Sequence, residues 1–431
     1  MSHNRVGYRQ LIRQNSNFRN LWFGQIISFL GDWFNLIASA SLIGQLSSSG
    51  LAIGGLFVVR MLAPFLVSPL AGVIADRYNR KRILFVADIL RAVVVLGFLL
   101  VREPQHLWLL YTLTALQLAI SGFFQPARNA ILPDIVSPRE LGTANALSSA
   151  TWSVMLAFGA ALGGLVAGMW GNQPAFIIDS ITFILSAIFI SRIAYQVPEA
   201  LQQADKTLRA ALTQYIDGLR YLWSHADILF IALHKSANAL FVSSGYQVIQ
   251  VKIAEEIFVW GQGGNYSLGA MFAAAGIGTG LGPILIRRFT GDDEGKMRRA
   301  LLLGYGLAAV GLAVSAPLVS FYWVLLGTIL RGIGGGITWV FSTQLLLQLL
   351  PNEMRGRVFS SEFAIFTLMS AAAAGGVGGA LDSPLGITGT LFAMAGLTLI
   401  PLLLWAVWLR LRLSRGVPAG SETVKQHYPD S

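Results

Sequence analysis

The 431-residue chain has no cysteine and only five histidines, and just 12% of its residues are charged. The absence of cysteine excludes disulfides and thiolate metal sites. With so few histidines, scattered along the chain, we expect neither a metal centre nor a bound cofactor. The charged fraction is about half that of an average soluble protein, whereas 54% of the residues are hydrophobic. This balance argues against a soluble, multidomain protein.

The motifs of common enzymes are also missing from the sequence. It contains no G-x-x-x-x-G-K-[ST] phosphate-binding loop and no His-Glu-x-x-His zinc motif. The glycine run Gly332–Gly336 lies within an apolar segment and is not placed like a nucleotide-binding loop. We therefore predict that the chain is not an enzyme and does not itself use ATP.

Long apolar segments dominate the sequence. A bilayer core about 30 Å thick is crossed by about 20 helical residues, and we predict an all-α membrane protein with twelve transmembrane helices. The predicted spans are roughly 20–42, 51–74, 83–101, 107–126, 143–168, 174–195, 227–250, 266–286, 300–318, 321–346, 358–380 and 387–410.

Lysine and arginine determine the predicted orientation, because cytoplasmic loops of membrane proteins carry an excess of these residues. With the N-terminus inside, 25 of the 31 cations fall in inside segments, and the outside loops hold only Arg102 and Lys252. The remaining four lie within spans: Arg60, Arg91, Lys235 and Arg331. We expect a multi-pass protein of the plasma (inner) membrane with both termini in the cytoplasm. The net charge of +10 reflects this distribution and does not indicate nucleic-acid binding.

The longest connection divides the predicted spans into two sets of six. Within it, apolar residues recur at helical spacing between Leu208 and Trp223, which predicts an amphipathic helix on the inner membrane face. The two sets repeat weakly, since Pro138–Gly142 and Pro351–Gly356 precede the fifth and eleventh spans. Such repeats are typical of transporters with a binding site near the bilayer midplane. The predicted organisation is a six-helix bundle at 1–195, a linker at 196–226, a second six-helix bundle at 227–410 and a tail at 411–431.

A short basic loop joins the second and third predicted spans. It reads Gly72-Val73-Ile74-Ala75-Asp76-Arg77-Tyr78-Asn79-Arg80-Lys81-Arg82. This pattern resembles the signature loop of the major facilitator superfamily, with matches at Gly72, Asp76, Arg77, Arg80 and Lys81. Asn79 stands where the family has glycine, and asparagine tolerates a left-handed conformation better than most residues. The second copy of the loop is degraded, because Ile286 occupies the position of the aspartate.

Further motifs resemble one branch of that superfamily, which contains enterobactin-type siderophore exporters and macrolide efflux pumps. They are Asn17–Gln25 with Gly31-Asp32, Phe124–Arg128, Ala144–Leu147 and Arg355–Val358. The lysophospholipid transporters form a related branch. The resemblance implies two pseudo-symmetric six-helix bundles that face each other across a cavity. We also predict a gating role for the signature loop, in which Asp76 accepts a hydrogen bond from Arg80 or meets the N-terminal dipole of the eleventh span, which starts near Val358.

Charged residues inside the predicted spans are functional candidates, since a charge in the bilayer interior is costly. Asp32 in the first span and Arg60 in the second lie at comparable depth, which favours an ion pair between them. Asp32 is then either the protonation site that couples a proton gradient to transport or part of a static pair. Asp88 and Arg91 share one face of the third span, and we interpret them as a structural ion pair.

In the superfamily, spans 1, 4, 7 and 10 line the central cavity. The resemblance therefore places five polar residues in or near it: Asp32, Gln117, His234, Lys235 and Arg331. Arg331 would hold an anionic substrate group or donate a hydrogen bond between helices. Lys235 would face the cavity or extend its amine to the inner surface. Trp33, Trp152 and Trp339 are deep enough to line a cavity for a bulky amphiphile or to serve in packing.

The run Gly159–Gly164 on the fifth span resembles the G-P-x-x-G-G signature of drug antiporters, with Ala160 in place of the proline. Small residues also permit close helix packing, so both interpretations stay open. The corresponding run Ala371–Gly379 predicts a close helix contact in the second half of the chain.

These observations favour a secondary active transporter that exports an amphiphilic small molecule of the drug or siderophore type by proton antiport with alternating access. One alternative keeps the fold and moves a lysophospholipid or another lipid at the inner membrane. Another is a transporter-like sensor that binds a ligand without transport. The expected partners are the substrate, protons and membrane lipids, and the expected state is a monomer.

Overall fold

The computed structural model describes residues 7–196 and 208–414. These residues form helices and connecting turns, with no β-strand among them. Twelve of the helical segments are long and apolar enough to cross a membrane. The predicted all-α fold with twelve spans is therefore confirmed. Much of the predicted linker and tail, residues 197–207 and 415–431, lies outside the described residues.

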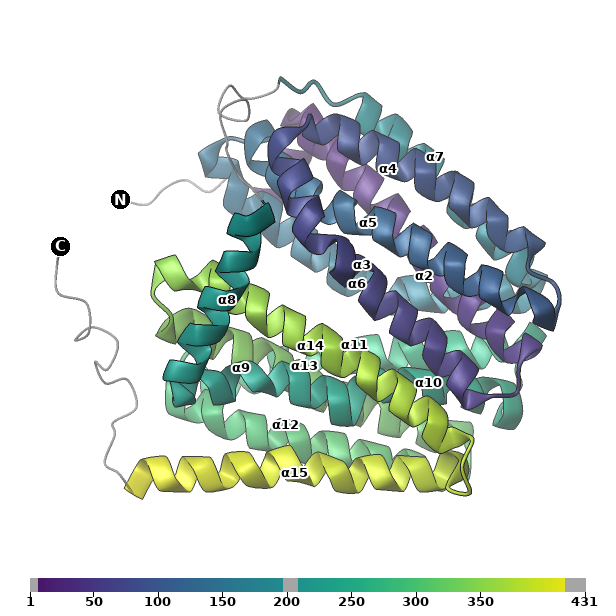
Figure 1. Ribbon diagram of the computed structural model, residues 1–431, viewed down its shortest axis with the longest axis vertical. Helices are drawn as coiled ribbons and strands as arrows, with labels where there is room; N and C mark the ends of the chain where they lie inside the picture. Colours follow the sequence, from purple (N-terminus) through teal and green to yellow (C-terminus); the bar gives the residue numbers. More distant parts are fainter. Residues whose placement is uncertain (1–6, 197–207, 415–431) are drawn as a thin grey trace. The chain divides into compact units, whose positions relative to one another are not determined.

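Contacts between residues divide the chain into two compact units (Figure 1). The first unit comprises the described residues of 1–212 together with 251–273, and the second comprises those of 213–250 and 274–431. The segment 251–273 thus packs with the first unit although it follows a span of the second. The division of the chain at residues 196–226 stays a prediction.

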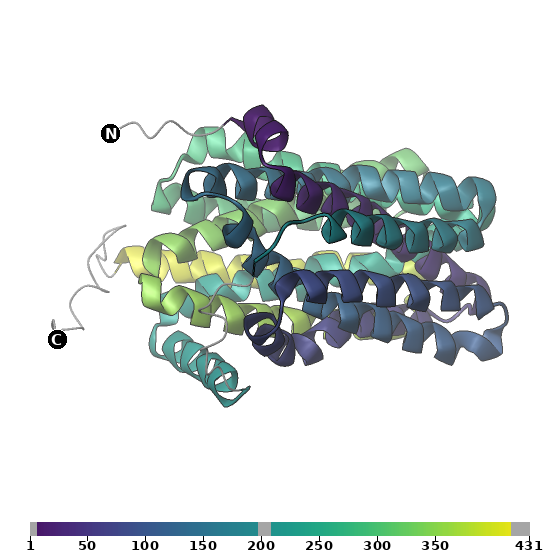
Figure 2. The ribbon, with the colours of Figure 1, turned by 90° about the horizontal axis from the view of Figure 1, so that it is seen from above.

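Helices α1 to α7 build most of the first unit. Their bounds are Tyr8–Gln14 (α1), Ser16–Leu46 (α2), Gly50–Arg77 (α3), Arg80–Leu96 (α4), Leu107–Ile135 (α5), Pro138–Trp170 (α6) and Asn172–Ser191 (α7). Helix α2 packs on α6 and α7, α4 packs on α5 and α7, and α3 packs on α5. Figure 2 shows these long helices running alongside one another.

Side-chain caps begin several of these helices. Asn15 Oδ1 accepts from Phe18 N at 2.9 Å at the start of α2, and Asn79 Oδ1 accepts from Arg82 N at 3.1 Å at the start of α4. Asn79 has a φ of −58°, so it does not adopt the left-handed conformation expected of a glycine replacement. Its place in the signature loop is explained instead by N-capping, for which asparagine is among the preferred residues.

The second unit is built from α8 to α15, with the start of α8, the end of α10 and the start of α11 in the first unit. The bounds are Leu208–Ser224 (α8), Ala226–Asn238 (α9), Ser244–Lys252 (α10), Asn265–Thr290 (α11), Glu294–Ser315 (α12), Phe321–Leu349 (α13), Asn352–Leu381 (α14) and Gly386–Ser414 (α15). A π-helical turn, Ala239–Ser243, joins α9 to α10, and a second one, Ile253–Ile257, follows α10. Helix α12 lies between α13 and α15 (Figure 1).

The glycine run of α13 packs this helix closely against two neighbours. A Cβ added at Gly332 would lie 2.7 Å from Ala275 O of α11, and one at Gly334 would clash with Gly304 O of α12. Gly336 approaches Thr279 O of α11 in the same way. Small residues at such interfaces allow helix backbones to approach each other in a membrane. The run is therefore a packing element of the second unit.

The small residues of α6 have a packing role as well. A Cβ added at Gly159 would lie 2.5 Å from Trp33 Cδ1 of α2, and one at Gly164 would lie 2.6 Å from Gly269 Cα. In the second unit, Gly379 has nothing within 4 Å of an added Cβ, and the close contact of this run is made by Val377 of α14 on Gly245 of α10. The predicted contact at Ala371–Gly379 thus exists, but the glycine that permits it lies on the neighbouring helix.

Helix α8 forms where the apolar spacing predicted an amphipathic helix. Leu222 is buried, whereas the side chain of Trp223 is 77% exposed. A Cβ at Gly218 would clash with Arg357 O of α14, and Arg357 forms an ion pair with Asp217 at 3.4 Å. The helix packs on α14, and its position at a membrane surface stays a prediction.

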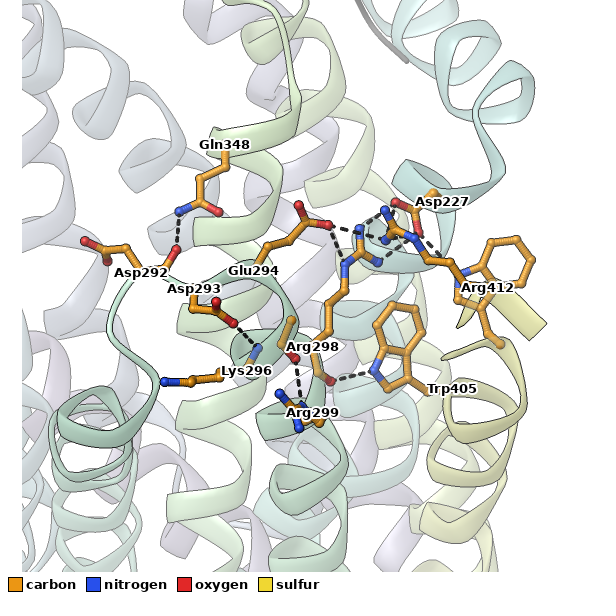
Figure 3. A network of polar contacts seen from close by, with 12 residues as sticks. Asp227, Asp292, Asp293, Glu294, Lys296, Arg298, Arg299, Gln348, Trp405 and Arg412 are labelled. Atoms are coloured by element: carbon orange, nitrogen blue, oxygen red, sulfur yellow. Dashed lines mark hydrogen bonds and ion pairs between the residues drawn. The ribbon is translucent and has the colours of Figure 1, made fainter. Parts of the chain in front are cut away.

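A network of ion pairs joins α9, α12 and α15 at one end of the second unit (Figure 3). Arg298 of α12 donates to both carboxylate oxygens of Asp227, at 2.8 and 2.5 Å, and to Glu294 at 2.8 Å. Arg412 of α15 donates to Asp227 Oδ2 at 3.1 Å, and Trp405 Nε1 donates to the backbone oxygen of Arg298 at 2.9 Å. The buried guanidinium of Arg298 therefore joins α12 to α9, and Arg412 and Trp405 attach α15 to the same network.

We expect Arg298→Gln to destabilise the protein by about 2 kcal/mol. Removing one partner of a buried ion pair costs about 3–5 kcal/mol, and Arg412 remains to satisfy part of the charge of Asp227 and Glu294. The measurement is thermal unfolding of the purified protein in detergent. The matched control is Arg287→Gln, whose ion pair with Asp292 has side chains 59% and 62% exposed and should contribute less than about 1 kcal/mol. Equal effects of the two substitutions would contradict the role given to Arg298.

Candidate functional site

The first unit contains a cavity with a volume of about 200 Å³. Its charged side chains are Asp32 of α2 and Arg60 of α3. The other lining residues are mainly aromatic or aliphatic: Phe29, Trp33, Leu118, Ser121, Trp152 and Met155. Apolar walls with a few polar groups are typical of small-molecule sites. The cavity is therefore the candidate binding site.

Asp32 belongs to an ion-pair cluster centred on Arg91 of α4. Arg91 Nη2 donates a hydrogen bond to Asp88 Oδ1, whereas Arg91 Nη1 lies 3.9 Å from Asp32 Oδ1. Phe124 and Phe183 cover the guanidinium, with their ring centroids 4.6 and 4.2 Å from Cζ. Asp88 is fully buried, but the side chain of Asp32 is 31% exposed. Arg91 thus holds Asp88 tightly and leaves Asp32 accessible from the cavity.

A third carboxylate, Asp179 of α7, is buried beside this cluster. A Cβ at Gly31 would clash with Asp179 Oδ1, so the glycine that precedes Asp32 lets α7 bring its carboxylate close to α2. Asp179 interacts electrostatically with Asp32, Arg91 and Arg60. Three carboxyl groups therefore share two guanidinium groups, and one bound proton makes the cluster neutral.

The structure changes the predicted partner of Asp32. Arg60 lines the same cavity, in line with its comparable depth, but no ion pair joins it to Asp32 among the described residues. Asp32 pairs instead with Arg91, which the sequence associates only with Asp88 on the same helix. Arg91 faces α2 as well because of the rotation of α4 about its own axis. This rotation cannot be predicted from the sequence.

Trp33 and Trp152 form part of the cavity wall, which is one of the two roles that their depth in the predicted spans suggested. Trp33 packs on Gly159 of α6 and meets Phe272 edge-on, with ring centroids 5.9 Å apart. Trp152 is 54% exposed. The antiporter-like glycine run therefore positions an aromatic side chain next to Asp32. Trp339 contacts Phe366 in the second unit, with ring centroids 5.2 Å apart.

Lys235 of α9 forms a buried ion pair with Glu362 of α14, with a distance of 3.0 Å from Nζ to Oε2. Its amine also lies 4.9 Å from the ring centroid of Trp339. The side chain does not extend to a surface, so that interpretation is wrong. Glu362 was not among the predicted site residues, although it is the one carboxylate within the predicted eleventh span. Applying the rule for intramembrane charges to this residue would have identified it.

The other predicted cavity residues are buried within the units. His234 Nδ1 lies 3.0 Å from Tyr305 Oη, and its ring meets Trp405 edge-on. Arg331 stacks on Tyr246, with Cζ 4.3 Å from the ring centroid. Gln117 of the first unit is 1% exposed. Their predicted part in a substrate cavity stays a prediction. No group of histidine and acidic side chains suited to a metal ion occurs within residues 7–196 and 208–414.

The signature loop contacts α5 through Arg80. Arg80 Nη1 donates to Asp134 Oδ2 at 2.5 Å and to Ala130 O at 3.1 Å. The side chain of Asp76 lies outside the described residues, so its predicted hydrogen bond from Arg80 stays a prediction. Of the other loop residues, Arg77 is exposed and Lys81 is half-buried. Gly72 has nothing within 4 Å of an added Cβ.

Asp134 is a second residue that the sequence did not indicate. It also accepts from Tyr195 Oη at 2.9 Å, and burial together with this hydrogen bond raises the pKa of Tyr195 to about 12. Tyr195 therefore stays a protonated donor near neutral pH. The carboxylate ties the start of α4 and the segment after α7 to the end of α5. Because these segments are distant along the chain, sequence spacing contains no signal for the contact.

Comparison with known proteins agrees with the fold. The sequence profile described as Major Facilitator Superfamily matches residues 21–374. The uncharacterized MFS-type transporter YfiS of Bacillus subtilis is 29% identical over 90% of this chain and 94% of its own length. The putative bacilysin exporter BacE of Bacillus subtilis is 24% identical over 80% of this chain and 84% of its own length. Macrolide efflux protein A of Streptococcus pyogenes is 20% identical over 81% and 86% of the two chains.

Among solved structures, the nucleoside transporter NupG superimposes with a TM-score of 0.68. The alignment covers 90% of this chain and 98% of that one, at 14% sequence identity. At this identity the likeness shows the fold and carries no information on the substrate. Because the family profile spans most of the chain and includes the signature loop, the chain belongs to the major facilitator superfamily and is a multi-pass membrane transporter, not an enzyme.

Proposed function

We propose that the chain exports an amphiphilic small molecule across the plasma (inner) membrane in exchange for protons. The observation that carries this proposal is the position of Asp32. Its carboxylate faces a cavity with aromatic and aliphatic walls, and it is only loosely paired with a cation. A carboxylate in this setting accepts either a proton or a cationic group of a substrate. Mutual exclusion of the two at one site is the physical basis of antiport.

The surrounding cluster supports this assignment. Asp88 is held by Arg91 in the interior of the unit, and Asp179 is fully buried. Asp32 is the member of the three that a cavity reaches. The excess of one carboxyl group over the guanidinium groups favours binding of one proton, since uncompensated charge is costly inside a membrane. Asp32 is the proposed site at which that proton enters and leaves.

The names of the relatives support export rather than uptake, since two of them are described as an exporter and an efflux protein. Orientation is proposed from the distribution of lysine and arginine. The segments that carry 25 of the 31 cations would face the cytoplasm, as the positive-inside rule requires. Both termini are then cytoplasmic.

In proteoliposomes, Asp32→Asn should reduce substrate-driven proton flux to the level of protein-free liposomes. The substitution keeps the shape of the side chain but removes its ability to exchange a proton. The flux is followed with an enclosed pH-sensitive dye, using erythromycin, a catechol siderophore, phenylalanyl-alanine and lysophosphatidylcholine as separate probes. The matched control is Asp292→Asn, which changes an exposed carboxylate of the second unit.

Unchanged proton flux in Asp32→Asn would refute the coupling role. Movement of lysophosphatidylcholine alone, without proton exchange, would establish the lipid-transporter alternative. Binding of a probe without flux of any probe would establish the sensor alternative.

The signature loop should control cycling rather than binding. We expect Asp76→Asn and Arg80→Gln each to slow substrate exchange while probe affinity stays within about twofold, because Arg80 contacts α5 and Ala75 O of α3 and does not line the cavity. Exposed Arg82→Gln is the matched control. Cycling is measured by labelling single introduced cysteines, which the cysteine-free chain makes straightforward. A large loss of affinity with normal cycling would contradict the gating role.

A further inference from the structure

We infer that the substrate of the Asp32 cavity is an amphiphilic zwitterion, with an ammonium group that binds Asp32 and an anionic group that binds Arg60. This inference rests on the proposed function, because it names the substrate class of the same cavity. It is carried by one juxtaposition: opposite charges from two different helices line a single cavity whose remaining wall is mainly apolar.

Arg60 is available for a ligand. It lines the cavity, and the part of the chain that the structure describes contains no ion pair or side-chain hydrogen bond of its guanidinium. Arg91 differs from it, since that guanidinium is buried between Phe124 and Phe183 and is held by Asp88. Of the two guanidinium groups in the cluster, Arg60 is therefore the one that can receive an anion.

Asp32 is available to bind a cationic group. Its distance of 3.9 Å from Arg91 is longer than that of a charge-assisted hydrogen bond, and its side chain is 31% exposed in a unit where Asp88 and Asp179 are not. An ammonium group is both the charge complement of this carboxylate and a hydrogen-bond donor to it. A proton and an ammonium group would therefore compete for the same oxygen atoms.

The charges of the cavity discriminate between classes of ligand. A singly charged cation gives Asp32 a hydrogen-bond donor but offers no acceptor to the guanidinium of Arg60, which Asp32 and Asp179 reach only electrostatically, and a singly charged anion does the reverse. Leaving the hydrogen-bonding groups of a buried charge unsatisfied is unfavourable. A neutral apolar ligand displaces water from both charged side chains and gives neither of them a hydrogen bond or an opposite charge. A zwitterion is the class that satisfies both charges at once.

The cavity walls indicate the size and polarity of the uncharged part of the ligand. Phe29, Trp33 and Trp152 present aromatic surface, and Leu118 and Met155 present aliphatic surface. Aromatic and aliphatic walls stabilise an apolar group by burial. The volume of about 200 Å³ lies below the about 300–1,000 Å³ typical of ligand sites. A compact molecule with one apolar group between two opposite charges fits these conditions.

The test compares three ligands that share one skeleton. Phenylalanyl-alanine has a free ammonium and a free carboxylate, its N-acetyl form is an anion, and its C-terminal amide is a cation. Binding to the full-length protein in detergent is measured by calorimetry at pH 7.5. We expect the zwitterion to bind at least about tenfold more tightly than either blocked form, a difference of about 1.4 kcal/mol. Equal or tighter binding of a blocked form, or no binding of the zwitterion, would overturn the inference.

Two variants assign the charges. Arg60→Gln should make the zwitterion and the amide bind equally, and Asp32→Asn should make the zwitterion and the N-acetyl form bind equally. Arg60→Lys keeps the charge and should keep the preference for a free carboxylate, which separates a binding role from a purely structural one. If Arg60→Gln still binds the zwitterion more tightly than the amide, the anionic group binds elsewhere and the role given to Arg60 is wrong. If a variant does not fold, the comparison of ligands on the unchanged protein still decides the substrate class.

The outcomes also separate this inference from the proposed function. Proton-coupled flux of erythromycin combined with no preference for the zwitterion would refute the substrate class and leave proton antiport intact. Tight, zwitterion-selective binding without any proton-coupled flux would support the substrate class and refute antiport.

Discussion

The cost of placing charge in hydrocarbon governs this structure. A charged side chain at the centre of a membrane helix costs about 2.5–3.5 kcal/mol even by insertion scales that give low values. In the first unit a cluster around Arg91 reduces this cost, and in the second the Lys235–Glu362 pair does so. Each guanidinium or amine joins helices that are separate along the chain. These ion pairs therefore also help to hold the relative rotation that packing gives those helices within a unit.

Close packing is what makes these pairings possible. Gly31 allows α7 to approach α2 so that Asp179 lies beside Asp32, and Gly159 allows α6 to approach α2 at Trp33. In the second unit, Gly332 and Gly334 bring α13 against α11 and α12. Lipid chains are as apolar as leucine, so helix association in a membrane depends on this kind of contact. Glycine positions thus control where polar groups meet and where a cavity remains.

The cavity of the first unit derives its chemistry from incomplete neutralisation. Arg91 donates a hydrogen bond to Asp88 but lies 3.9 Å from Asp32, while Arg60 faces the cavity. A fully paired cluster would be a structural element and nothing more. The incompletely paired charges of Asp32 and Arg60 are the groups that a proton and a substrate can bind. The signature loop lies outside this chemistry, since Arg80 contacts Asp134 and Ala130 on α5 and Ala75 O of α3.

The sequence by itself determined the twelve spans, the superfamily and most of the intramembrane charges, because apolar length, motif spacing and the rarity of charge are properties of local sequence. It did not determine which charges meet. Asp32 pairs with Arg91 rather than Arg60, Lys235 pairs with Glu362 rather than reaching a surface, and Arg80 pairs with Asp134. Asn79 caps α4 although its spacing suggested a left-handed turn. These outcomes depend on how each helix is rotated and how closely it approaches its neighbours, and packing between distant segments, which local pattern does not contain, decides both.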